Sequence, residues 1–220
     1  MIFQPISLEN WERREYFEHY FSQVPCTYSM TVKLDITPLI RAKVRLYPSM
    51  LYCLAAVVNR HREFRMAFDK EGRLGFFTQM HPCYTVFHKD SETFSNLWTE
   101  YTDDYRAFCR AYRDDVEQYK DIPGFMPKPG APDNLFNVSM LPWESFEGFN
   151  LNLQRGYDYL LPIFTMGRYY EDNERIFLPL AVQVHHAVCD GFHVCRFVAE
   201  LREVVRTLET AAQEIERKTP

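Results

Sequence analysis

Residues 176–193 decide how this chain is interpreted, and they read IFLPLAVQVHHAVCDGFH. Their first part is apolar with alternating small or polar positions, as in a strand, and Asp190-Gly191 gives a sharp turn signal. From Val194 to Ile215 apolar residues recur every three or four positions, as on one face of a helix. The stretch therefore predicts a strand that ends at a turn and leads into a helix packed on the sheet.

The rest of the chain predicts a mixture of helices and strands. We expect helices over residues 11–20, 36–43, 49–60 and 94–119, the last from aromatic residues at helical spacing. We expect strands over residues 27–35, 84–88, 135–140, 149–153, 163–168 and 176–186. Residues 123–132 are rich in proline and glycine and predict an irregular loop. No repeat or linker divides the sequence, so a single domain over residues 1–220 is expected.

Composition excludes several classes of protein. Hydrophobic residues are 46% and charged residues 25% of the 220, which is typical of a globular protein and not of a disordered one. The net charge of -5 offers no basic surface for nucleic acid. The longest apolar run, 50–58, is too short to span a membrane, and no signal peptide is recognisable. Six cysteines without a C-x-x-C pair indicate reduced thiols. We therefore expect a cytoplasmic protein that binds neither nucleic acid nor membrane.

The reactive side chains gather at the strand end. His185 and His186 point to opposite faces of a strand, so both could bind one ion only on a distorted backbone, and no metal site is expected. His186 continues an apolar stripe, where burial favours a neutral ring that can accept a proton. The alternative is a buried histidine satisfied by hydrogen bonds. Asp190 could accept backbone N–H groups, hold a cation, or be purely structural.

The run HHAVCDGFH at 185–193 resembles the signature of the chloramphenicol acetyltransferases, the trimeric type that depends on coenzyme A. A bare HHxxxDG also occurs in dihydrolipoyl acyltransferase domains, which need long linkers to other domains, and in condensation domains, which are about twice as long. Other segments resemble the chloramphenicol enzymes in the same chain order: WERREYFE (11–18), PCTY (25–28), LDIT (34–37), EFRMA (63–67), HPCYTVFH (81–88), SMLPW (139–143), FNLN (149–152) and FTMG (164–167).

This resemblance implies an α/β fold, a two-layer sandwich in which helices cover a mixed β-sheet, as in other acyltransferases that depend on coenzyme A. It also implies a cyclic homotrimer with active sites between subunits. Acetyl-CoA would be a co-substrate, with no cofactor permanently bound. The implied reaction acetylates a hydroxyl of chloramphenicol by direct attack on the thioester, which inactivates the antibiotic.

The resemblance also implies roles for individual catalytic residues. His186, the second histidine of the pair, matches the general base that removes the proton from the acceptor hydroxyl. Ser139 matches a serine whose hydroxyl stabilises the oxyanion, and Thr165 matches a threonine that holds a nearby water. Asp190 and Arg13 match a buried ion pair that braces the catalytic loop. His186 would come from one subunit, and Ser139 and Phe149 from its neighbour.

The substrate pockets follow from the same resemblance. Aromatic and aliphatic residues that would bind the acceptor are Tyr20, Val24, Cys26, Tyr28, Phe94, Phe149 and Leu151. Positions near coenzyme A are Trp143, Arg168 and Tyr169, of which Arg168 could meet a phosphate.

Two departures from the family pattern concern the acceptor. Residues 122–130 differ from the family's shorter proline loop, so that Phe125 or Met126 could replace a pocket aromatic, and Val24 differs from the best-known members. One alternative function is therefore a same-fold acyltransferase that acts on another hydroxylated small molecule. Another is a protein that binds CoA thioesters or serves as a scaffold without turnover, although the presence of His186, Ser139 and Asp190 argues against it.

Overall fold

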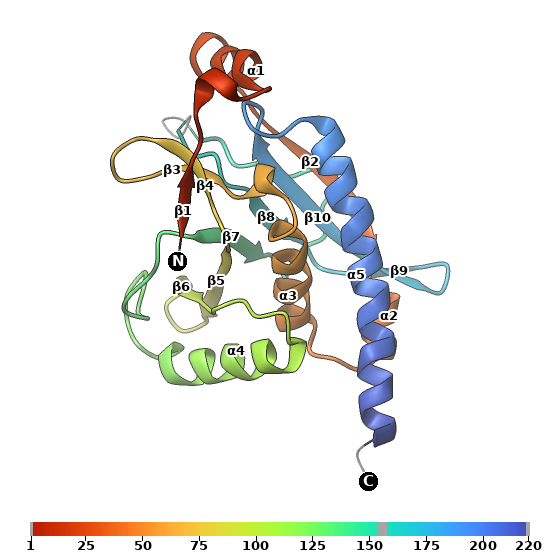
Figure 1. Cartoon of the computed structure of the whole chain (residues 1–220). Coiled ribbons are helices and arrows are strands. Elements are labelled where there is room, and N and C mark those ends of the chain that lie inside the picture. The colour runs from red at the N-terminus through yellow and green to blue at the C-terminus, as the bar shows by residue number, and fades with distance from the viewer. Residues whose placement is uncertain (1, 154–157, 219–220) are drawn as a thin grey trace.

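The computed structural model describes residues 2–153 and 158–218, whose strands form two sheets (Figure 1). The large sheet has the order β2-β10-β8-β7-β5-β6, with β9 paired to β10, and the small sheet has the order β1-β4-β3. The pairs β5–β7 and β7–β8 are parallel and the other pairs are antiparallel, so the large sheet is mixed, as predicted. The strands are β1 (Phe3–Pro5), β2 (Thr27–Asp35), β3 (Met66–Phe68), β4 (Leu74–Phe77), β5 (His81–His88), β6 (Thr93–Trp98), β7 (Leu135–Met140), β8 (Ile163–Met166), β9 (Tyr170–Asp172) and β10 (Arg175–His185).

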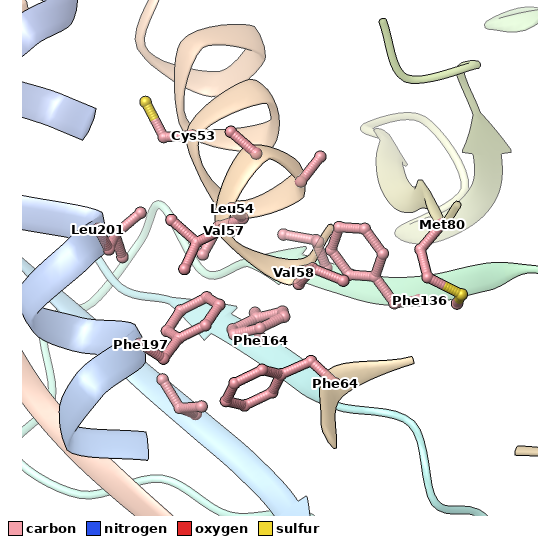
Figure 2. Packing of buried hydrophobic residues seen from close by; sticks show 14 of the residues in the cluster. Cys53, Leu54, Val57, Val58, Phe64, Met80, Phe136, Phe164, Phe197 and Leu201 are labelled. Atoms are coloured by element: carbon pink, nitrogen blue, oxygen red, sulfur yellow. The ribbon is translucent and has the colours of Figure 1, made fainter. Parts of the chain in front are cut away.

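Helices cover one face of the large sheet and enclose the hydrophobic core. Phe164 of β8 stacks on Phe197 of α5, and Phe64 also packs on Phe197 (Figure 2). Tyr84 of β5 meets Tyr47 of α3 and Tyr112 of α4. The helices are α1 (Arg14–Glu18), which continues as a π-helical turn (His19–Gln23), α2 (Thr37–Arg41), α3 (Leu46–Val58), α4 (Tyr105–Tyr119) and α5 (Gly191–Lys218), with single 3-10 turns at Leu8–Asn10 and Arg62–Phe64.

Adjacent residues of the strands serve opposite faces. Paired positions on the helix side form an apolar row across the sheet: Leu97, Tyr84, Val138, Phe164, Val182 and Met30. One residue further along, Ser139 pairs with Thr165, Thr165 with Ala181, and Ala181 with Thr31, which gives a row of small and mostly polar side chains on the face without helices. The side-chain period of two in a strand produces this separation.

Two predicted elements are wrong. Residues 94–98, expected to begin the long helix, belong to strand β6, because they pair with β5 and bury Ser95 and Leu97 on alternate positions. The helix begins only at Tyr105, where the Asp104 side chain accepts the N–H groups of Arg106 and Ala107. Residues 149–153, expected as a strand, have no strand partner in the part of the chain that is described.

The other predicted elements are present with shifted ends, because local periodicity locates helix ends poorly. The helix expected at 11–20 begins at Arg14, and the strand expected at 163–168 ends at Met166. Residues 123–132 form no helix or strand, as predicted. Within the described residues no helix is both long and apolar enough to cross a membrane.

Candidate active site

His186 lies directly after β10 and is enclosed by the N-terminal segment. Its backbone N–H donates to the Cys26 carbonyl at 2.9 Å, which ties the end of β10 to the residue before β2. Its ring stacks on Tyr20, with 3.8 Å between centroids and 5° between planes, and meets the edge of Tyr28 at 5.3 Å. The side chain is 28% exposed, but Nδ1 is buried and makes no hydrogen bond to any described residue. The ring is therefore fixed between two tyrosines with one nitrogen turned inward.

An ion pair braces the turn that carries His186. Arg13 donates to both carboxylate oxygens of Asp190, at 2.5 and 3.0 Å, and so ties the start of α1 to the start of α5. These hydrogen bonds, with the charge of Arg13, hold the pKa of Asp190 below its usual value, and Asp190 in turn raises the pKa of Arg13. Asp190 Oδ1 lies 3.4 Å from His186 Nδ1. The turn therefore keeps a permanent carboxylate beside the buried side of the ring.

Ser139 and Thr165 form a second centre on the face of the sheet without helices. They are paired residues of the parallel strands β7 and β8, and their hydroxyl oxygens lie 3.2 Å apart. Thr165 also pairs with Ala181 of β10, and His186 lies five residues further along. At the usual rise of a strand this separation is about 17 Å. One chain therefore does not bring Ser139 and Thr165 to His186.

Residues 149–151 cross the face of β2 and β10 that carries no helices, and they bring some of the residues predicted to bind the acceptor together. Gln183 accepts the N–H of Leu151 at 2.7 Å and donates to its carbonyl at 3.0 Å. A side chain therefore makes the hydrogen bonds that a neighbouring strand would make in a sheet. Phe149 donates its N–H to Thr31 Oγ1 at 3.3 Å. A cleft of about 620 Å³ lies beside this segment, and Tyr28, Leu151 and Gln183 contribute to its walls.

Sequence reasoning missed Gln183, which is buried yet polar in an otherwise apolar run. That contrast was the available signal, because a buried amide requires hydrogen-bond partners. A local pattern could not name those partners, since Leu151 lies 32 residues away.

The other residues predicted to bind the acceptor are more scattered. Val24 is 52% exposed at the end of the turn that follows α1. Phe94 lies on the edge strand β6, four strands from β10, a separation of about 19 Å at the usual strand spacing. It packs edge-on against Phe125 of the proline-rich loop, with 6.0 Å between ring centroids. Phe94 is thus outside the group around His186 within one chain.

The proline-rich loop is docked on β6 although it has no regular structure. Asn96 donates its N–H to the Phe125 carbonyl at 2.7 Å. Lys128 donates to the Trp98 carbonyl at 2.9 Å, pairs with Asp115 at 2.7 Å and lies over the Trp98 ring. These contacts fix Phe125 beside Phe94.

The three positions expected near coenzyme A lie on neighbouring exposed turns. Trp143 follows β7, is 57% exposed and meets Phe87 edge-on at 4.7 Å. Arg168 and Tyr169 follow β8 and are also exposed, and the Arg168 N–H donates to the Glu144 carbonyl at 2.8 Å. The structure therefore brings the turns of Trp143 and Arg168 side by side.

Known proteins resemble this chain over nearly its whole length. The family model for chloramphenicol acetyltransferase matches residues 1–202. The chain is 60% identical to a chloramphenicol acetyltransferase of Vibrio anguillarum, covering 95% of this chain and 97% of that protein. It is 57% identical to one of Clostridium perfringens, covering 94% and 100%.

Solved structures confirm the predicted fold class. A structure named chloramphenicol acetyltransferase superposes with a TM-score of 0.79 at 22% identity, covering 93% of this chain and 100% of that chain. The dihydrolipoamide acetyltransferase of Azotobacter vinelandii has a TM-score of 0.62 at 14% identity, with 87% and 86% covered. With the matches in sequence, these findings show that the chain belongs to the chloramphenicol acetyltransferase family.

Proposed function

We propose that this chain transfers the acetyl group of acetyl-CoA to a hydroxyl of chloramphenicol and so inactivates the antibiotic. It would act as a single domain over residues 1–220 in a cytoplasmic homotrimer. The observation that carries the proposal is the fixed His186 ring, which stacks on Tyr20 beside an ionised Asp190 in a member of this family. His186 would be the general base, because its second ring nitrogen, Nε2, is left to meet an acceptor hydroxyl.

The reaction needs no covalent enzyme intermediate. His186 Nε2 takes the proton of the acceptor hydroxyl while the oxygen attacks the thioester carbonyl. The Ser139 hydroxyl donates to the resulting oxyanion. The Thr165 hydroxyl, whose oxygen lies 3.2 Å from the Ser139 hydroxyl oxygen, holds a water nearby. The intermediate then expels the thiolate of coenzyme A, which takes the proton from the imidazolium. Arg13 and Asp190 do not react and keep the ring in position.

The separation of His186 from Ser139 supports an active site formed between subunits. In one chain the two residues stand at different ends of the sheet face, so neither can complete the reaction with the other. In a cyclic trimer each interface would join His186 of one subunit to Ser139 and Thr165 of the next. Within the row of small and mostly polar side chains, Ser139 and Thr31 are only partly buried in one chain, so this part of the face is open to a neighbouring subunit.

The two substrates would enter from different sides of that interface. Chloramphenicol would lie against residues near His186 from one subunit and against further aromatic and aliphatic residues from both. These are Tyr20, Val24, Cys26 and Tyr28 in the segment that encloses the histidine, Leu151 in the cleft that it shares with Tyr28, and Phe94 and Phe149 further from the histidine. Acetyl-CoA would lie along the turns of Trp143, Arg168 and Tyr169, where the exposed Arg168 can meet a phosphate.

The test measures release of the CoA thiol with and without chloramphenicol. We expect the His186→Ala variant to lose about 10²–10⁴-fold in rate, since it lacks the base. Ser139→Ala should lose about 10²–10³-fold, since it lacks one oxyanion donor. If wild-type protein binds acetyl-CoA but releases the thiol only when another hydroxylated molecule is present, that molecule and not chloramphenicol is the acceptor. The docked Phe125 beside Phe94 makes that comparison necessary.

A mixture of the two variants tests whether the site lies between subunits. When His186→Ala and Ser139→Ala chains are unfolded together and refolded, some interfaces join an intact His186 to an intact Ser139. Random equal mixing should restore about one quarter of the wild-type activity in a cyclic trimer. Activity equal only to the sum of the separately refolded variants would contradict the shared site. In the control, each variant is refolded alone and the two are mixed only after they have assembled.

A further inference from the structure

A second set of polar side chains, which are partly buried, lies beside the Arg13–Asp190 pair and consists of Glu63, His193 and Arg196. The backbone N–H of Asp190 donates to His193 Nδ1 at 2.9 Å, so this nitrogen carries no proton. His193 Nε2 lies 3.3 Å from Glu63 Oε1, and the same oxygen accepts a hydrogen bond from Arg196 at 2.7 Å. Contacts therefore run from Glu63 through the His193 ring to the backbone of Asp190.

The charge states of these residues suit a fixed support. Burial lowers the pKa of His193, which keeps the ring neutral and Nδ1 available as an acceptor. Burial opposes ionisation of Glu63, but hydrogen bonds from its own backbone N–H and from Arg196 outweigh it and leave the Glu63 pKa below its usual value. A charged Glu63 favours the tautomer with the proton on Nε2. The tautomer that accepts the Asp190 N–H is thus the one that Glu63 stabilises.

We propose that Glu63 and His193 are positioning residues that hold Asp190, and through it His186, in the reactive arrangement. This inference rests on the proposed function. The Asp190 backbone lies at the turn between β10 and α5, and its carboxylate holds Arg13 and faces His186 Nδ1. Without an acceptor at His193 the turn loses one of the contacts that set the direction of the carboxylate. His186 would then spend less time in the orientation that accepts the substrate proton.

A matched control lies in the same region of the molecule. Glu200 contacts His61 at 2.8 Å and Arg60 at 3.2 Å. Like Glu63, it is a glutamate that contacts one histidine and one arginine. In the described residues no hydrogen bond connects the Glu200 set to the turn at Asp190. The two sets differ in that connection, and a role in positioning requires it.

The experiment compares steady-state kinetics of Glu63→Gln and Glu200→Gln with acetyl-CoA and chloramphenicol. We expect Glu63→Gln to lower kcat several-fold, the size of one ordinary hydrogen bond, with both KM values within about twofold. Glu200→Gln should leave kcat unchanged. Equal losses in both variants, or a change confined to KM, would overturn the proposal. Melting temperatures and the oligomeric state identify any general loss of structure.

Two variants of His193 test the contact to Asp190 directly. His193→Leu removes the acceptor and should lower kcat by about tenfold, whereas His193→Asn places an oxygen near the Nδ1 position and should recover most of that loss. Equal kcat values in the two variants would contradict the role. If the leucine variant does not fold, the Glu63 and Glu200 pair still decides the question. Wild-type protein that shows no chloramphenicol-dependent thiol release would instead contradict the proposed function.

Discussion

The two faces of the large sheet differ although the same strands build both. On the helix side Phe164 and its paired neighbours are apolar and pack against α3, α4 and α5. On the other side Thr165 and its neighbours are small or polar, and residues 149–151 cross them through side-chain hydrogen bonds. Because adjacent residues point to opposite faces, one residue can contribute to the stability of the core while its neighbour in the strand contributes to the proposed chemistry on the other face. A register shift of one residue would move the apolar side chains to the face without helices and the polar side chains to the helix side.

The largest expected effect concerns the helix side. Phe164 is fully buried between Phe136 and Phe197, and Phe164→Ala leaves a cavity there. We expect the free energy of unfolding to fall by about 3–5 kcal/mol, measured by urea denaturation at one protein concentration. The activity per mole of folded protein should stay near that of the wild type. A large loss of kcat in fully folded protein would contradict the separation of the two faces.

The sequence predicted the helix side better than the edges of the sheet. Strand β10 and the turn at Asp190-Gly191 were visible because apolar residues and turn residues carry that signal locally. Strand β6 was missed because Phe94, Trp98, Tyr101 and Tyr105 repeat at helical spacing across a strand, a loop and a helix start. Pairing with β5, which no local pattern contains, decides the conformation of residues 93–98.

The site was predictable only in part for a similar reason. The resemblance led to a buried Arg13–Asp190 pair, which the structure contains, although with side chains 20% and 33% exposed it is only partly buried. It also led to Ser139 and Thr165, which the structure places side by side on β7 and β8. The contact of Gln183 with Leu151 depends on the path of the chain between them and was not predicted. In the proposed trimer His186 of one subunit would meet Ser139 of the next, and that arrangement depends on contacts between chains, which no local pattern in one sequence contains.

A smaller effect is expected on the outer face, at the neighbour of Phe164. Thr165→Val removes the hydroxyl next to Ser139 and keeps the shape of the side chain. One lost hydrogen bond is worth about 0.5–1.5 kcal/mol, so we expect kcat to fall by up to about tenfold. The free energy of unfolding should fall by about 0.5–1.5 kcal/mol, because the hydroxyl is buried and its hydrogen bond with Ser139 is lost, which is still less than the fall expected for Phe164→Ala. Thr165→Ser keeps the hydroxyl and is the control, and equal kcat values for the two variants would argue against a role for the hydroxyl.

The smallest expected effect separates structure from chemistry within the outer face itself. His81 lies on that face, where its Nδ1 accepts the Tyr101 N–H at 2.9 Å, and burial lowers its pKa. Below pH about 6.5, His81 therefore binds a proton in the unfolded chain while it is still neutral in the folded chain. The free energy of unfolding should fall as the pH falls from 6.5 towards 5. His81→Asn keeps an acceptor that does not titrate and should flatten this slope without changing kcat. The slope should not vanish, because burial also lowers the pKa of His193. An unchanged slope would show that His81 is not held neutral, and a loss of kcat would extend the chemical region of the face to the first residue of β5.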